Sequence, residues 1–220
     1  MLVQRSARWR RLSLAVAFAL VVALAIAAQP CQAQTVDAAV SAIESHYRDL
    51  VDLTAKVVQK NHLKALGKTQ TFEAQLWIRK PGRLRLDYTN GQVIVIDDNS
   101  ALFYSQKSSQ MIKKSFDDIE RLNIPVAFLL SAARIRDSFD VYPSDAASLL
   151  RLDLVPKKKD AAMKKLVLGV DANGRISTLT IFDKSGNMTE IFFSEVQEGA
   201  GLDRKVFNFK PPAGTEIIEQ

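Results

Sequence analysis

The stretch "QLWIRKPGRLRLDY", residues 75–88, contains two short segments joined by a Pro-Gly corner. On each side of the corner, apolar side chains alternate with polar or charged ones, the period-two pattern of a strand with one buried face. Four cations, Arg79, Lys80, Arg83 and Arg85, surround the corner. The stretch therefore predicts two antiparallel strands connected by a strongly basic turn.

Similar strand patterns recur on both sides of this hairpin. They are separated by turn residues such as Asn90-Gly91 and Asn173-Gly174. Successive short strands joined by tight turns favour an antiparallel meander over βαβ units. The patterns cover residues 68–80, 82–88, 92–98, 101–106, 109–115, 139–143, 149–157, 164–171, 175–183, 188–197 and 206–211.

Two segments have helical spacing instead. Thr35 is a good N-cap, and the apolar positions that follow it predict an amphipathic helix over about 35–51. A second helix-like segment covers 117–137, where Pro125 suits a helix start and residues 124–133 are too apolar for a solvated connector. One long meander with two apolar helical segments predicts a single domain, a curved sheet with helices on its concave side.

The first 33 residues have the features of a secretory signal peptide. Four arginines precede an apolar run of fifteen residues, and Cys31-Gln32-Ala33 supplies small residues before a cut. The run is shorter than the ~20 residues of a membrane-spanning helix. We therefore expect removal of residues 1–33 and a single exported domain over 34–220. An uncleaved anchor and acylation at Cys31 are the alternatives.

Removal of this segment changes the charge of the chain. The formal net charge is +6, but four of the 30 basic residues lie in the leader, so 26 remain against 24 acidic residues. The expected mature chain is thus nearly balanced and lacks the strong basicity on which nucleic-acid binding rests. It also loses Cys31, its only cysteine, so we expect neither a disulfide nor a nucleic-acid partner.

The sequence contains no recognisable catalytic or metal-binding pattern. Only His46 and His62 are available as imidazole bases, and we expect both on solvated surfaces. There is no metal-ligand spacing, no G-x-S-x-G turn and no glycine-rich phosphate loop. We therefore expect no enzymatic activity, no metal and no cofactor, with an unrecognised hydrolase as the alternative.

The segment "PKKKDAAMKK", residues 156–165, gathers five lysines at a predicted hairpin tip. It suits a solvated loop that keeps edge strands from pairing with other chains. It also suits a docking surface for an acidic partner or lipid headgroups. The sequence leaves both interpretations of Lys157–Lys165 open.

Taken together, several stretches resemble the LolA-like family, the periplasmic carriers of outer-membrane lipoproteins in Gram-negative bacteria. None is specific alone, but five occur in the family's order over nearly all of the expected mature chain. They are "LWIRKPGRLRLDY", "QVIVIDDNSALFYS", "NIPVAFLLSA", "LVLGVDANGRISTLTIFDKSGNMTEIFFSEV" and "LDRKVFNFKPPAGTEII". The resemblance implies a mainly β fold, an unclosed antiparallel β-barrel of about ten or eleven strands covered by lid helices.

The resemblance also implies a function. A carrier of this family binds the acyl chains of triacylated lipoproteins that an ABC-type complex releases from the inner membrane. It crosses the periplasm, as a monomer here, and delivers the cargo to an outer-membrane lipoprotein receptor. Such a carrier is needed because each methylene of an acyl chain gains ~0.8 kcal/mol on leaving water. The alternative is an envelope-stress sensor, or a regulatory lipid- or peptide-binding protein of the same fold.

The family places an arginine directly before the proline of its strand-turn-strand, where it bonds backbone carbonyls of the lid helices and holds them closed. Alignment on Pro81 puts Lys80 at that position and Arg79 one residue earlier. Adjacent strand residues face opposite sides, so Lys80 is favoured as the latch and Arg79 is the alternative. Lysine is a flexible point charge, whereas arginine offers a rigid fork of donors.

The resemblance assigns apolar residues to two groups, although periodicity itself indicates only burial. The lid helices would contribute Val40, Ile43, Tyr47, Val126, Leu129 and Leu130. Leu84 is also a candidate for a position near a partner-contact loop. The acyl-chain cavity would be lined by Phe72, Leu76, Leu84, Leu86, Ile94, Ile96, Phe103, Leu152, Leu154, Leu168, Leu179, Ile181, Ile191 and Phe193.

Overall fold

The computed structural model describes residues 35–98, 100–115, 124–145, 148–158 and 163–219. Residues from Thr35 onward form one compact unit. The predicted signal peptide over 1–33 lies outside the described residues.

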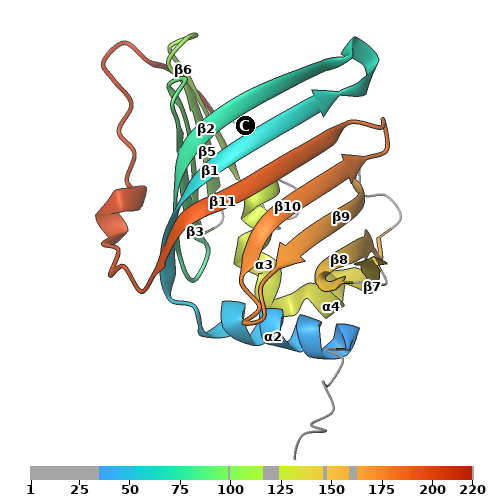
Figure 1. The fold of residues 1–220 in the computed structure, drawn as a ribbon. Coiled ribbons are helices and arrows are strands. Elements are labelled where there is room, and N and C mark those ends of the chain that lie inside the picture. Colours follow the sequence, from blue (N-terminus) through green and yellow to red (C-terminus); the bar gives the residue numbers. More distant parts are fainter. Residues whose placement is uncertain (1–34, 99, 116–123, 146–147, 159–162, 220) are drawn as a thin grey trace, which may run out of the picture. The chain divides into compact units, whose positions relative to one another are not determined.

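A twelve-stranded sheet dominates the fold (Figure 1). The strand order is β12-β6-β5-β4-β3-β2-β1-β11-β10-β9-β8-β7. Strand β1 therefore lies between β2, which follows it in the chain, and β11, which comes much later. The terminal strands β12 and β7 do not pair with each other, and the sheet is an open half-barrel, which confirms the predicted fold class. The strands are β1 Asp52–Leu63, β2 Lys68–Arg79, β3 Arg83–Tyr88, β4 Gln92–Asp97, β5 Ser100–Ser105, β6 Gln110–Ser115, β7 Phe139–Asp145, β8 Ser148–Pro156, β9 Met163–Val170, β10 Ile176–Asp183, β11 Met188–Glu198 and β12 Glu216–Glu219.

Helices cover one end and the concave side of this sheet (Figure 1). Helix α2, Val36–Asp49, begins where the Thr35 side chain accepts a hydrogen bond from Ala38 N at 3.2 Å. The other helical elements are short. They are η3 Pro125–Ala127, α3 Phe128–Ser131, η4 Ala132–Arg134 and α4 Ile135–Ser138, with η1 Lys64–Leu66 and η5 Arg204–Phe207 elsewhere in the chain.

The two faces of the sheet have separate apolar clusters. We call inner the face that packs against α2, α3 and α4, where the large core cluster lies. The outer face carries a smaller cluster, in which Val93, Val95 and Tyr104 pack with Phe207 of the C-terminal segment. Alternation along β4 explains the division, because Ile94 belongs to the inner cluster and its neighbours do not.

Three sequence expectations were wrong. Strand β1 was missed, because its alternation of apolar and polar residues ends at Val57. The expected strand at 206–211 is instead part of η5 and an extended segment, because the Asp203 carboxylate accepts from Lys205 N at 2.9 Å and starts a turn. Strand β12 was also missed, and it pairs with β6 in parallel. The sheet therefore has twelve strands and one parallel pair.

The second helical segment begins with η3 and proceeds to α4, in three- and four-residue pieces. The earlier part of that prediction, residues 117–123, lies outside the described residues.

Candidate functional site

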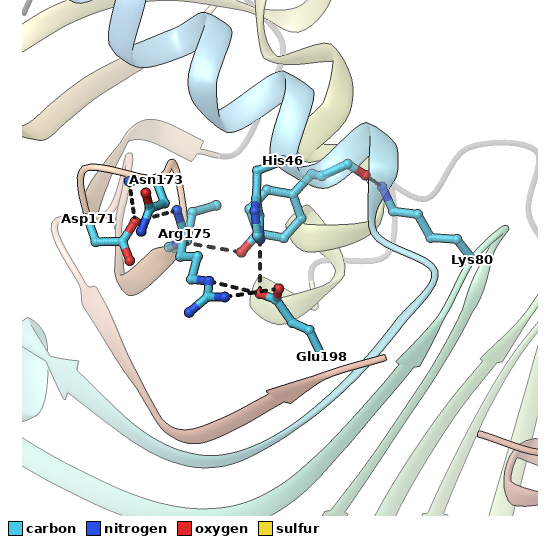
Figure 2. A network of polar contacts seen from close by, with 8 residues as sticks. His46, Lys80, Asp171, Asn173, Arg175 and Glu198 are labelled. Carbon is cyan, nitrogen blue, oxygen red and sulfur yellow. Dashed lines mark hydrogen bonds and ion pairs between the residues drawn. The ribbon is translucent and has the colours of Figure 1, made fainter. Parts of the chain in front are cut away.

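Lys80 follows the end of β2 and contacts the last turn of α2. Its Nζ donates to the backbone oxygen of Tyr47 and lies 5.9 Å from the centre of the Tyr47 ring (Figure 2). The last carbonyls of a helix have no partner within the helix and carry its negative end, so a cation suits them. Burial lowers the pKa of Lys80 below its ordinary value. These are contacts that a latch on the first helix would make.

Arg79, the neighbouring candidate, contacts a different part of the chain. Its guanidinium donates to the backbone oxygen of Leu202, in the segment after β11. Leu202 N in turn donates to the Asp52 carboxylate at 3.1 Å. The last residue of β2 and the residue after it thus hold two different segments, the C-terminal segment and a helix.

A second polar group joins α2 to the sheet (Figure 2). The Tyr47 hydroxyl accepts from Ile176 N at 3.3 Å, and burial raises the pKa of Tyr47. Next to it, His46 Nε2 lies 2.9 Å from Glu198 Oε1, while Arg175 Nε lies 3.4 Å from the same oxygen. His46 was expected on a solvated surface, but its side chain is only 16% exposed.

His62 is likewise paired. Its ring nitrogens lie 2.9 Å from Thr69 Oγ1 and 2.7 Å from Glu190 Oε2. Register explains this, because β1 lies between β2 and β11 and brings side chains of both strands alongside His62.

The turn between β9 and β10 packs directly against α2. Asp171 Oδ1 accepts from Asn173 N at 2.8 Å and from Arg175 N at 2.9 Å, which shapes the turn. Gly174 has a φ of +80°, and a Cβ there would lie 2.5 Å from the carbonyl carbon of Ala42. Only glycine fits, since both the backbone angle and the space exclude a side chain.

Glu44 joins the helices to each other. This nearly buried carboxylate accepts from Arg136 N at 3.0 Å and also pairs with the Arg136 guanidinium. The same guanidinium donates to Asp37 O at 2.9 Å and Ser41 Oγ at 3.0 Å. Helix α2 and the start of α4 are therefore fastened together on their polar sides.

The predicted lid residues lie in the inner core. Val40, Ile43, Tyr47, Val126 and Leu129 are buried there, and Leu130 packs against them. The structure thus brings α2, η3 and α3 together over the sheet, while their role as a movable lid stays a prediction.

Most of the predicted cavity residues are packed in that same core. The following nine have no exposed surface: Leu76, Leu84, Leu86, Ile96, Leu152, Leu154, Leu168, Leu179 and Ile191. Ile94, Phe103, Ile181 and Phe193 are partly buried against them. Side chains of the protein therefore fill the space beneath the helices in this state. For Leu84, burial in the core is what the structure shows.

An actual cavity of about 270 Å³ lies further along the inner face. Phe72, Ile94 and Phe103 are the predicted residues that line it. Most of the other lining residues are polar, and none of these others was predicted to line the cavity. They are Gln59, Asn61, Tyr88, Gln92, Tyr104, Ser105, Ser108 and Gln110, together with Val93 and Ile112.

The lysine-rich hairpin is only partly described, since residues 159–162 are outside the described ranges. Lys165 Nζ lies 2.7 Å from Asp153 Oδ2 and 5.2 Å from the centre of the Phe182 ring. Lys157 Nζ donates to the backbone oxygen of Arg136 at 2.5 Å. These two lysines therefore make contacts within the chain, and whether the hairpin docks to a partner stays open.

Within the described ranges, no group of three His, Cys, Asp or Glu residues is arranged to hold a metal ion. None of the helices in those ranges has the length and apolar character needed to cross a membrane.

The chain is similar to known proteins in sequence and in fold. Residues 49–210 match the family model described as outer membrane lipoprotein carrier protein LolA. An outer-membrane lipoprotein carrier protein from Pseudomonas aeruginosa is 28% identical over 204 residues, 91% of this chain and 96% of that protein. One from Chromobacterium violaceum is 29% identical over 208 residues, 91% of this chain and 97% of that protein.

Among solved structures, an uncharacterized conserved protein from Thermus thermophilus has a similar fold. The TM-score is 0.51 at 12% identity, over 84% of this chain and 98% of that one. At this identity the likeness concerns the fold alone.

Proposed function

The chain belongs to the LolA family of outer-membrane lipoprotein carrier proteins, and we propose that it carries lipoproteins by enclosing their acyl chains. The observation that carries this proposal is an open sheet whose apolar inner face is covered by separate helices. Such a face can exchange its helical cover for another apolar ligand without unfolding the sheet.

The size of the present cavity supports a movement of the helices on cargo binding. At about 270 Å³ it is no larger than the smallest common ligand sites, which begin near ~300 Å³. A triacylated anchor with dozens of methylenes needs more room. We infer that acyl chains occupy the space where Ile43 and Leu129 now pack, beneath displaced helices.

This exchange also accounts for release. An acyl chain on the inner face would replace apolar contacts with the helices, so only the difference between the two states contributes to affinity. A carrier must retain its cargo in water and still transfer it, and a small net gain permits both. The lid thus lowers the affinity that an uncovered apolar trough would have.

Lys80 is the latch in this proposal. It supports the closed state through its contact with the Tyr47 carbonyl, together with the Ile176–Tyr47 hydrogen bond at the other side of the helix end. Both contacts are polar and local, so they can break without disrupting the apolar core of the sheet. Arg79 holds the C-terminal segment instead.

The route of transport follows from the same proposal. Residues 1–33 act as a cleaved signal peptide, and residues 34–220 work as a monomer in the periplasm. Cargo arrives from an ABC-type release complex at the inner membrane and leaves to a lipoprotein receptor at the outer membrane. The family is one of carriers, and the proposal includes no catalytic step.

The direct test uses purified residues 34–220 and a triacylated lipoprotein presented in detergent that is then removed. The proposal expects a water-soluble one-to-one complex by size exclusion and light scattering, and no complex with the unacylated form. Equal binding of both forms would overturn it. Depletion in cells separates a carrier from a sensor, since only loss of a carrier leaves outer-membrane lipoproteins at the inner membrane.

A further inference from the structure

We propose that the inner face has a second, polar subsite that binds the ester and amide groups joining acyl chains to the polypeptide. The subsite, here called the amide band, consists of Gln59, Asn61, Tyr88, Gln92, Ser105 and Gln110, all of which line the cavity. The inference rests on the proposed function. It assigns a ligand to the polar residues of the cavity, whose presence the binding of apolar acyl chains does not explain.

The sheet register places these residues at one level. On β4 and β5, Ile96 pairs with Ala101 and Ile94 with Phe103, and then Gln92 pairs with Ser105. Ser105 in turn pairs with Gln110 of β6. Neighbouring strands therefore change from apolar to amide or hydroxyl side chains at the same point.

Strand β1 makes the same change. Its inner positions run from Ala55 and Val57, which are buried, to Gln59 and Asn61, which are not. Gln59 pairs with Phe72 of β2, one of the apolar residues that line the cavity. The band thus begins where the apolar trough ends.

Side chains in the band form a directed hydrogen-bond chain. The Tyr88 hydroxyl donates to Gln59 Oε1 at 3.0 Å, and Gln59 Nε2 donates to Asn61 Oδ1 at 3.0 Å. Burial raises the pKa of Tyr88 to about 12, so its hydroxyl stays a neutral donor at physiological pH. The chain ends at the Asn61 amide nitrogen, whose N–H donors have no partner among the described residues.

The absence of charged side chains from the described lining favours a neutral ligand group. Among the described residues that line the cavity there is no lysine, arginine, aspartate or glutamate. A phosphate headgroup placed here would lose water without gaining a cation, which is unfavourable. Ester and amide carbonyls need only neutral donors, which carboxamides and hydroxyls supply. The band therefore suits the neutral linkage of a lipoprotein anchor and not the headgroup of an anionic phospholipid.

The position of the band fits this role. Arg83 and Tyr88, the two ends of β3, are five residue steps apart, a length of ~17 Å along the strand. The apolar face between them carries the buried Leu84 and Leu86, and in the proposed function acyl chains reach it once the helices are displaced. The polypeptide of the cargo can then leave past Gln92 and Ser108, which are exposed.

The test compares two synthetic cysteine lipopeptides that both keep the amide-linked chain, one with two ester-linked chains on the glyceryl group and one with two ether-linked chains that lack those carbonyls. We expect residues 34–220 to bind the first about tenfold more tightly, as one or two hydrogen bonds would give. In the double variant Gln59→Leu/Asn61→Leu this preference should disappear. The variant Gln75→Leu, which removes an amide from the opposite side of β2, is the matched control and should keep it.

The outcomes separate the two proposals. Equal binding of both peptides by the unaltered protein, or an unchanged preference in the double variant, overturns the amide band and leaves the carrier function intact. Binding of neither peptide overturns the carrier function itself. Should the leucine variant not fold, Asn61→Asp keeps the side-chain size, removes the donors and should likewise abolish the preference.

Discussion

The two ends of the inner face differ in what covers them and in what their side chains can do. At the helix-covered end, residues such as Leu84 and Ile96 have no exposed surface and belong to the same core cluster as residues of α2 and α3. At the far end, Gln59 and Gln92 line a cavity with neutral polar groups. An apolar trough must be covered whenever it is empty, whereas amides and hydroxyls can face water permanently. One sheet face thus has a packed apolar end and a polar end that lines a cavity.

A substitution at Gly174 should disturb the packing of the helix-covered end more than any other change proposed here. Replacement by valine forces a β-branched residue into a positive φ and drives its Cβ into the α2 backbone, which we expect to cost about 3 kcal/mol or more in stability. Urea denaturation measures this loss, and a hydrophobic dye should bind as α2 is displaced. The control is Gly199→Val, with a φ of +65° but no atom within 4 Å of the added Cβ, so it carries only the backbone strain. An equal cost in both variants would contradict the packing role of this turn.

Lys80→Leu should loosen the covered end without unfolding it. The lost contact is a hydrogen bond from a half-buried ammonium group to the end of α2, worth about 1–2 kcal/mol. Binding of a hydrophobic dye to the empty protein should therefore rise severalfold. Arg79→Leu should leave dye binding unchanged, because Arg79 contacts Leu202 and not the helix. If only Arg79→Leu raised dye binding, the latch would have to be reassigned.

The sequence predicts the covered end better than the open end. Alternation around Pro81 identified β2, β3 and the opposite orientations of Arg79 and Lys80, and their separate contacts agree with it. The same method missed β1, because Gln59 and Asn61 occupy inner positions where apolar residues were expected. The open end was therefore not predicted because its inner-facing residues are polar.

Periodicity also cannot distinguish a core from a cavity. Both need apolar side chains at every second strand position, and only the packing of other elements decides which one forms. Leu152 and Leu168 were assigned to a cavity, and in the structure they are core residues. Strand β12 was beyond prediction for a different reason, since its four residues depend on the edge of β6 for pairing.

At the open end, Tyr88→Phe should have a smaller effect. It removes the hydroxyl that donates to Gln59, a net loss of about 1 kcal/mol or less, and keeps the ring that packs against Phe72. We expect weaker binding of ester-linked lipopeptide with unchanged dye binding to the empty protein. A rise in dye binding would instead place Tyr88 in the closure of the lid.

A site remote from both ends provides the smallest expected effect. Burial alone would raise the pKa of Asp153, but the hydrogen bond and charge of Lys165 lower it below the ordinary value of 3.8. This pair contributes about 0.5 kcal/mol, fully present above pH ~4 and lost as the pH falls through the lowered pKa. In Asp153→Asn that part of the acid dependence should be missing from urea denaturation between pH 2 and 5, with lipopeptide binding at pH 7 unchanged. An identical pH profile in both proteins would show that the pair contributes nothing.

The most direct measurement of the central claim is the distance between α2 and the sheet with and without cargo. Residues 34–220 contain no cysteine, so spin labels can be placed at Ser45→Cys on α2 and Ser194→Cys on β11, both exposed positions. Double electron–electron resonance should give one short distance in the empty protein and a longer one, by several ångströms, in complex with a triacylated lipoprotein. An unchanged distance in the loaded complex would mean that acyl chains bind without moving the helix, and would contradict this account.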